Sequence, residues 1–520
     1  MVFLESPVRA RLKGYENQEA ALRDSLSYKD KRAEFEYLST RRTIKRFKRQ
    51  RSFFEGRDGT EAYLARLEAM ERHQAEVKAT ITKTVLGKDE GGLWIPSGLA
   101  HTIGVDDEIT LGYSVPEFDE LPWAKKPKYT DRPYQVDATN LMLEAAGHGP
   151  VGIELATGAG KSTIIRNITK RIGLGTVVMA PSRSIAKQLF IDLTYHFGPR
   201  LVGMYGDGKK QYDKHIVVGI DDSLTRVVPG SDAWIALSAK PVFIADESHL
   251  CPAETLAKVC YGLMGGSPLR FFVSATQMRG DGLTIVLEGI TGRIVMRMNV
   301  QELVGLGFLS RPHFGMFSVK SNRSYSSDDA VRMTREHLYY NPIVNKTAAD
   351  TANRFIEQKR PVIILVEEVE QFGKLLPHFK HLAKFAHGPL TKDNRDSVPT
   401  AFQKDKPDDL VAEFNAGKLP ILVGTSCIAT GTDIQVAEAG IYLMGGKSEI
   451  KIKQAVGRET RGGFNGSVTN PWTGKQKTDC VHIDFRVDNI EALARHADER
   501  VEVYNDIFPT CSRVDMTHIK

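Results

Sequence analysis

Short apolar runs alternate with helical periods from about residue 134 to the end of the chain. Runs of this kind, rich in β-branched residues and bounded by turn signals, are typical of buried parallel strands. A first series comprises Val151–Leu155, Thr176–Ala180, Ile216–Ile220, Val242–Ala245 and Phe271–Ser274. A second series comprises Val362–Val366, Ile421–Gly424, Gly440–Met444 and Val481–Phe485. The pattern predicts an α/β protein with two tandem, doubly wound parallel sheets.

The first 122 residues differ in sequence pattern from the rest of the chain. Two helical runs, at about Gln18–Phe54 and Thr60–Val85, flank the turn signal Glu55–Gly59, which predicts a helical hairpin. A segment rich in proline and glycine, from Gly87 to Pro133, contains a predicted linker. The expected domains are an α-rich (α+β) accessory domain at 1–122 and two parallel-sheet domains at 123–305 and 306–520.

The predicted hairpin carries a concentrated positive charge. Seven of the eleven residues from Arg41 to Arg51 are Lys or Arg, with no acid among them. One interpretation is a solvated helix face. The other is a patch that grips nucleic-acid phosphates, and the net charge of +6 suits such a partner without requiring it. The candidate contacts are Arg42, Lys45, Arg46, Lys48 and Arg49.

Composition excludes several classes of protein. The 520 residues are 41% hydrophobic and 26% charged, which suits a globular chain with several cores. No window approaches the apolar length of a transmembrane helix, and the first residues lack the apolar core of a signal peptide. Five cysteines without a C-x-x-C pair disfavour a disulfide framework or a zinc ribbon. We therefore expect a cytoplasmic protein without a membrane partner.

A glycine-rich segment, Leu155-Ala156-Thr157-Gly158-Ala159-Gly160-Lys161-Ser162, follows a predicted strand and precedes a predicted helix at Thr163–Ile172. This is the context of a phosphate loop, in which glycines let the backbone approach phosphates and the helix N-terminus attracts the anion. Lys161 is then expected between the β- and γ-phosphates, and Ser162 on Mg²⁺. Leu155 replaces the first glycine of the general pattern, and the alternative is an ordinary strand-to-helix turn.

A pair of carboxylates ends another predicted strand. Asp246 and Glu247 follow the apolar run Val242–Ala245, about 85 residues after the phosphate loop. Ligands gather at the carboxyl ends of strands in such sheets. Asp246 is expected to hold Mg²⁺ and Glu247 to orient or deprotonate the attacking water. Alone, the pair would be no more than a charged strand terminus.

Further short segments occur in a fixed order between about residues 130 and 490. They are Arg132-Pro133-Tyr134-Gln135, Ala180-Pro181-Ser182-Arg183, Asp246-Glu247-Ser248-His249, Ser274-Ala275-Thr276, Gly424-Thr425 with Ala429-Thr430-Gly431-Thr432-Asp433, and Gln454-Ala455-Val456-Gly457-Arg458-Glu459-Thr460-Arg461. Together with the phosphate loop, this ordered set resembles the motifs of the superfamily 2 helicases. The resemblance implies two RecA-like sheets, with ATP and Mg²⁺ as cofactors.

The resemblance also assigns roles to individual residues. Those expected in catalysis are Lys161, Asp246, Glu247, Gln454, Arg458 and Arg461. Those expected to contact ATP are Gln135, Thr157, Gly158, Ala159, Gly160, Lys161, Ser162, Thr163 and Asp433, and those expected on Mg²⁺ are Ser162 and Asp246. Those expected to couple ATP to nucleic acid are Pro181, Arg183, His249, Ser274, Thr276, Thr425 and Thr432.

Within the superfamily the chain is most similar to the phage UvsW-like DNA helicases. The similarity includes Gln454, the segment Leu93–Leu99 and the stretch Asn489–Arg500, whereas the basic segment is longer than in that family. It implies an ATP-dependent DNA helicase or translocase that unwinds or branch-migrates forks, Holliday junctions or displacement loops in replication, recombination or repair. The alternatives are a helicase for RNA or RNA–DNA hybrids, the motor subunit of a restriction or remodelling complex, and an ATP-gated binding module.

Overall fold

The structure is a computed structural model that describes residues 2–13, 15–29, 31–49, 60–79, 82–90, 92–103, 109–127, 129–277, 283–323, 329–391, 394–429, 432–466 and 468–515. The chain divides into two compact units: Met1–Glu154 with Ser162–Arg297, and Leu155–Lys161 with Met298–Lys520. The expected boundaries after residues 122 and 305 stay predictions. In the ranges given above, no helix has the length and apolar character needed to cross a membrane.

The first unit contains the first predicted parallel sheet. Among the described residues its strand order is β11-β10-β12-β9-β13-β14-β8-β15. The strands are β8 (Val151–Leu155), β9 (Thr176–Ala180), β10 (Val202–Gly206), β11 (Lys209–Lys210), β12 (Ile216–Ile220), β13 (Val242–Asp246), β14 (Leu269–Ser274) and β15 (Arg293–Met298). The pairs from β10 to β8 run parallel, so their carboxyl ends share one edge. All strands of the first predicted series are confirmed.

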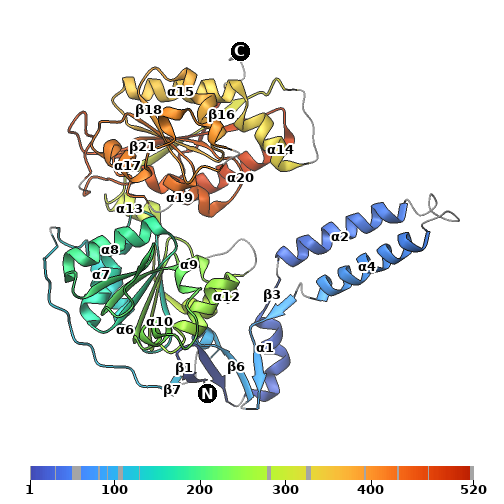
Figure 1. Ribbon diagram of the computed structural model, residues 1–520, viewed down its shortest axis with the longest axis vertical. Coiled ribbons are helices and arrows are strands. Elements are labelled where there is room, and N and C mark those ends of the chain that lie inside the picture. Colours follow the sequence, from blue (N-terminus) through green and yellow to red (C-terminus); the bar gives the residue numbers. More distant parts are fainter. Residues whose placement is uncertain are drawn as a thin grey trace. The chain divides into compact units, whose positions relative to one another are not determined.

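Helices cover both faces of this sheet (Figure 1). Val177 and Met179 of β9 and Phe243 of β13 pack in a core with α9, α10 and α12. Their neighbours along each strand point to the other face, as the two-residue period of a strand requires. The helices are α6 (Pro133–Glu144), α7 (Lys161–Ile172), α8 (Arg183–Phe197), α9 (Asp221–Leu224), α10 (Asp232–Ser238), α11 (Glu254–Lys258) and α12 (Thr284–Thr291).

The second unit contains the second predicted parallel sheet. Among its described residues the order is β18-β19-β17-β20-β21-β16-β22, with every pair parallel. The strands are β16 (Arg311–Val319), β17 (Val362–Val366), β18 (Ala383–Ala386), β19 (Ile421–Gly424), β20 (Ala439–Leu443), β21 (Asp479–Val487) and β22 (Ser512–Asp515). The predicted second series is confirmed, with end shifts of one or two residues.

Alternate residues of β17 enter two different cores in the second unit. Ile364 packs with α15 and α16, whereas Ile363 and Leu365 pack with α17, α19 and α20. A strand covered on both faces must be apolar at every position, as Val362–Val366 is. The helices are α13 (Val300–Gly305), α14 (Ala330–Thr334), α15 (Pro342–Glu357), α16 (Glu370–Leu375), α17 (Pro407–Asn415), α18 (Ser426–Ala429), α19 (Glu449–Glu459) and α20 (Glu491–Ile507).

A small sheet of order β5-β6-β2-β1-β7 precedes the first parallel sheet. Its strands are β1 (Val2–Ser6), β2 (Arg9–Leu12), β5 (Gly87–Asp89), β6 (Gly92–Pro96) and β7 (Ile109–Leu111), and α5 (Ala100–Ile103) follows β6. A Cβ on Gly98 would lie 2.4 Å from the Glu288 carbonyl oxygen of α12. The segment Leu93–Leu99 therefore needs a glycine there to pack against the first parallel sheet's helices.

The predicted hairpin is present but shorter than expected. Helices α2 (Lys31–Arg49) and α4 (Thr60–Ala79) lie side by side (Figure 1). The helical run expected from Gln18 is broken, because α1 (Glu19–Ser25) is followed by β3 (Ser27–Lys29), which pairs antiparallel with β4 (Thr82–Thr84). Ser27, Tyr28, Thr82 and Thr84 have low helix propensity, which favours this ribbon over longer helices.

Candidate functional site

The phosphate-loop segment forms a tight connection between β8 and α7. Gly158 and Gly160 have φ values of +89° and +83°, a backbone region that favours glycine. Leu155 is fully buried as the last residue of β8. A strand position in the core requires no glycine, which explains the departure from the general pattern. The other predicted ATP-contacting residues lie in the loop or in the first turn of α7: Thr157, Ala159, Lys161, Ser162 and Thr163.

Two carboxylates lie at the same edge of the sheet. Asp246 is the last residue of β13 and is 8% exposed, and its Oδ1 accepts the backbone N–H of Glu247 at 3.0 Å. Glu247 has φ +50° and ψ +48°, an unusual left-handed conformation for a residue with a side chain. Strained backbone of this kind is concentrated at functional sites. The carboxylate and hydroxyl oxygens of Asp246 and Ser162 are ligand types that fit Mg²⁺.

Buried hydrogen bonds join the residues after β13 to those after β14. His249 Nδ1 lies 2.9 Å from Ser274 Oγ, and this hydroxyl donates to the Thr276 carbonyl at 2.7 Å. Because the hydroxyl has one proton, His249 Nδ1 is the donor toward Ser274. Gln277 Nε2 donates to Ser248 Oγ at 3.0 Å. The predicted coupling residues His249, Ser274 and Thr276 are thus brought together, and Gln277 is an addition that the sequence motifs did not indicate.

The remaining predicted residues of the first unit lie at two other helix starts. Gln135 occupies the first turn of α6, where its Oε1 accepts the backbone N–H of Arg132 at 2.9 Å. Pro181 and Arg183 follow β9, and Arg183 is exposed and ion-paired with Asp207 at 3.0 Å. Gln135 therefore has a structural role in its own helix, and Arg183 is presented at the surface.

In the second unit, both predicted arginines are held by the segment after β19. Arg458 is 5% exposed and donates to the Thr432 carbonyl oxygen, and Arg461 is ion-paired with Asp433. Gln454 is half-buried on α19, about one turn before Arg458 and two turns before Arg461. The two predicted motifs therefore contact each other through Arg458 and Arg461.

The predicted coupling threonines lie near these contacts. Thr425 directly follows β19, and Thr432 is buried with its hydroxyl donating to the Ile428 carbonyl at 2.9 Å. Thr430 and Gly431 lie outside the described residues. The segment therefore places a threonine at each end of the connection between β19 and the arginine-binding residues.

Sequence reasoning missed a buried polar group in the second unit. Glu459, which stands between the two predicted arginines, is 1% exposed and lies 3.0 Å from Nδ1 of His482, also 1% exposed. Burial raises the pKa of Glu459; burial also lowers that of His482, but the nearby carboxylate outweighs it, so the pKa of His482 is raised. Polar residues at alternate positions of the apolar strand Val481–Phe485 were the signal that could have found this group.

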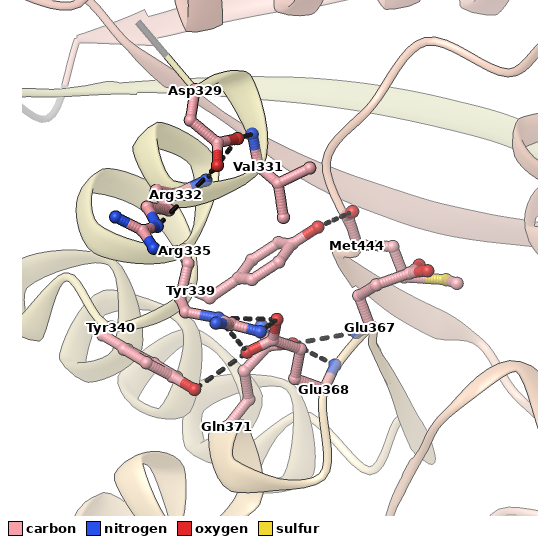
Figure 2. A network of polar contacts seen from close by, with 10 residues as sticks. All are labelled: Asp329, Val331, Arg332, Arg335, Tyr339, Tyr340, Glu367, Glu368, Gln371 and Met444. Carbon is pink, nitrogen blue, oxygen red and sulfur yellow. Dashed lines mark hydrogen bonds and ion pairs between the residues drawn. The ribbon is translucent and has the colours of Figure 1, made fainter. Parts of the chain in front are cut away.

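A second missed cluster lies at the carboxyl ends of β17 and β20 (Figure 2). Glu368 accepts from Arg335 Nε at 2.8 Å and from the Tyr340 hydroxyl at 2.8 Å. Tyr339 donates its hydroxyl to the Met444 carbonyl at 2.6 Å. Arg335 and Tyr339 belong to a π-helical turn, a rare form that is frequent at functional sites.

The predicted basic patch lies on α2. The side chains of Arg42 and Lys45 are exposed, whereas Lys48 is ion-paired with Glu71 of α4 at 2.6 Å. Arg46 and Arg49 are in α2, but their side chains lie outside the described part. Ile44 is 6% exposed and packs inside the hairpin. The helix therefore separates an apolar inner side from positive groups at the surface.

Comparisons with known proteins agree with this arrangement. The family model for the type III restriction enzyme res subunit matches residues 128–278. The family model for the helicase conserved C-terminal domain matches residues 347–463. A DNA 3'-5' translocase XPB2 of Sulfurisphaera tokodaii is 22% identical over 69% of this chain and 84% of that protein.

Solved structures share the fold. A putative HsdR subunit of a type I restriction enzyme from Vibrio vulnificus is similar over 75% of this chain and 70% of its own, with 14% identity and a TM-score of 0.53. The structure of T4 UvsW aligns over 99% of both chains with 14% identity, but its TM-score of 0.40 is too low to show a shared fold.

Two RecA-like parallel sheets with a phosphate loop in the first define the motor class of nucleic-acid helicases and translocases. The chain belongs to the superfamily 2 helicases, as its ordered motifs and both family matches indicate.

Proposed function

We propose that this chain is an ATP-driven DNA helicase or translocase that acts on forks, four-way junctions or displacement loops. The main support is the phosphate loop: two glycines in left-handed backbone conformations lead directly into the twelve-residue helix α7. Such a helix start supplies backbone N–H groups and a positive dipole end to an anion. A non-motor binding module would share this loop, so turnover is the property to measure.

The proposed hydrolysis assigns one task to each group around the first parallel sheet. Lys161 contacts the β- and γ-phosphates, while Ser162 and Asp246 hold Mg²⁺, which neutralises charge on the transferred phosphoryl group. Glu247 orients the attacking water and accepts its proton. Gln135 contacts the adenine. The hydrogen bonds from His249 to Ser274 then connect the Glu247 turn to the end of β14.

In the second unit, Arg458 and Arg461 offset the charge that develops on the phosphoryl group. Gln454 and Asp433 complete the ATP contacts from this unit. ATP favours the state of the protein that makes the most contacts with it, and hydrolysis removes that difference in contacts. Thr276, Thr425 and Thr432 link this change to nucleic-acid backbone contacts, together with Pro181 and Arg183.

DNA is the favoured partner. A relative that matches over 69% of this chain and 84% of its own length is called a DNA translocase, and the exposed cations of α2 form a patch suited to phosphates. The test is ATP hydrolysis measured side by side with single-stranded, duplex, forked and four-way DNA and with RNA. We expect forked and four-way DNA to stimulate most. Stronger stimulation by RNA would overturn the choice of DNA, and no stimulation by any nucleic acid would overturn the motor assignment.

The α2 patch gives a separate prediction. Changing Arg42→Glu and Lys45→Glu should weaken forked-DNA binding about tenfold and reduce the slope of log affinity against log salt by about two, because two phosphate contacts are lost. ATP hydrolysis without DNA should stay unchanged. Affinity measured over a series of salt concentrations checks this.

The matched control makes the same change of charge on α4, the other helix of the hairpin. Arg66→Glu and Arg72→Glu change two exposed arginines of α4. If both double variants lose the same affinity, the effect belongs to total charge and not to the α2 patch.

A further inference from the structure

A chain of buried polar contacts begins at the arginine-bearing turn of α19. The Glu459 carboxylate accepts from His482 Nδ1, with both oxygens 3.0 Å away. His482 Nε2 lies 3.2 Å from the Tyr504 hydroxyl, which donates to Asp484 Oδ2 at 2.8 Å. The tyrosine has a single proton, so His482 donates from both ring nitrogens.

The same chain continues to a turn at the carboxyl end of β20. Arg500 contacts Asp484 with Nε at 2.6 Å and with Nη2 at 3.0 Å, and its Nη1 donates to the Gly446 carbonyl at 2.8 Å. The side chains of Asp484 and Arg500 are each 2% exposed. A continuous path therefore runs from Glu459 to Gly446, entirely within the second unit.

The fold makes room for this path at a specific position. A Cβ on Gly440 of β20 would lie 1.6 Å from Glu459 Oε1, so only glycine admits the carboxylate into the core. Burying a charge costs free energy unless the charge is paired. A protein in which apolar residues of similar volume replace a buried ion pair is often equally stable. Here every charge has a partner, and the two ends of the path reach functionally distinct places.

The locations of the two ends of the path indicate a role beyond packing of the core. Glu459 lies in the same helical turn as Arg458, which binds the segment after β19. Gly446 adjoins Lys447, whose side chain is 58% exposed and ion-paired with Glu499 at 3.0 Å, at the strand edge where ligands gather in parallel sheets. Closely packed interiors transmit strain, so a displacement of one end is expected to alter hydrogen-bond geometry at the other.

We propose that Glu459, His482, Tyr504, Asp484 and Arg500 form a positioning relay through which nucleic acid at the Gly446 turn adjusts the arginines of α19. The relay rests on the proposed function, since it serves nucleic-acid-stimulated ATP hydrolysis. Tyr504 is its central member, and its ring is stacked on Phe314 with centroids 4.8 Å apart. The substitution Tyr504→Phe removes the hydroxyl and keeps this ring.

The test compares Tyr504→Phe with the wild type, and uses Tyr113→Phe as the matched control. The Tyr113 hydroxyl donates to the Gly147 carbonyl in the first unit, outside the relay. In Tyr504→Phe we expect the ratio of DNA-stimulated to basal kcat to fall about tenfold with KM for ATP within about twofold, since arginine placement matters in the transition state. The control should keep the wild-type ratio. An unchanged ratio, or an equal fall in both rates, would overturn the relay.

Amide hydrogen exchange supplies a readout that does not depend on activity. In Tyr504→Phe, exchange should increase together at residues 458–460 and 445–447, because both ends of the relay lose their common restraint. An increase confined to α20 would overturn the proposal. A wild-type chain that hydrolyses no ATP would instead overturn the proposed function, and the exchange measurement would still decide the relay.

Discussion

Replacing Lys161 with alanine should abolish nucleic-acid-stimulated ATP hydrolysis and leave DNA binding largely intact. Lys161 is the first residue of α7, directly after the two left-handed glycines. Its ammonium group is the charge that the substitution removes, whereas the backbone N–H groups stay in place. Loss of one group that stabilises developing charge costs on the order of 10²–10³ in rate.

The measurement is kcat with saturating forked DNA, beside DNA affinity at a fixed salt concentration. Lys258→Ala is the matched control, because Lys258 is a lysine outside the phosphate loop with a 71% exposed side chain. Its rate should equal that of the wild type. Hydrolysis by Lys161→Ala at the wild-type rate would refute the phosphate-loop assignment.

Replacing Arg461 with alanine should lower kcat by about 10³–10⁵ while KM for ATP changes only a few-fold, as for an arginine that acts on the transition state. Arg461 is ion-paired with Asp433. A guanidinium presents several donors in a fixed plane, and a lysine does not. Arg461→Lys should therefore restore little of the rate.

The control for this prediction is Arg226→Ala, which removes an arginine with a 77% exposed side chain from the first unit. Single-turnover hydrolysis separates chemistry from ATP binding. If Arg461→Ala raised KM and left kcat unchanged, the arginine would bind the nucleotide without acting on the transition state.

The sequence predicted most of both parallel sheets, because fully buried strands are continuous apolar runs. Val362–Val366 and Ile216–Ile220 were placed with their exact bounds for this reason. It missed β10, β11, β15, β16, β18 and β22. In β16 and β18 polar residues interrupt the apolar pattern: His313 in the first and Lys384 in the second. The predicted helical run from Gln18 was also too long, since β3 and β4 form by pairing across residues far apart in the chain.

The sequence by itself determined the class of this protein. Motifs such as the phosphate loop and the arginines of α19 depend on local spacing, which the order of residues records directly. Only the tertiary structure decided that Arg461 pairs with Asp433, that Leu155 belongs to the core, and that Glu459 reaches Gly446 through β21 and α20. These contacts join elements that are distant in sequence, and buried polar groups are satisfied by whichever partner the fold brings near.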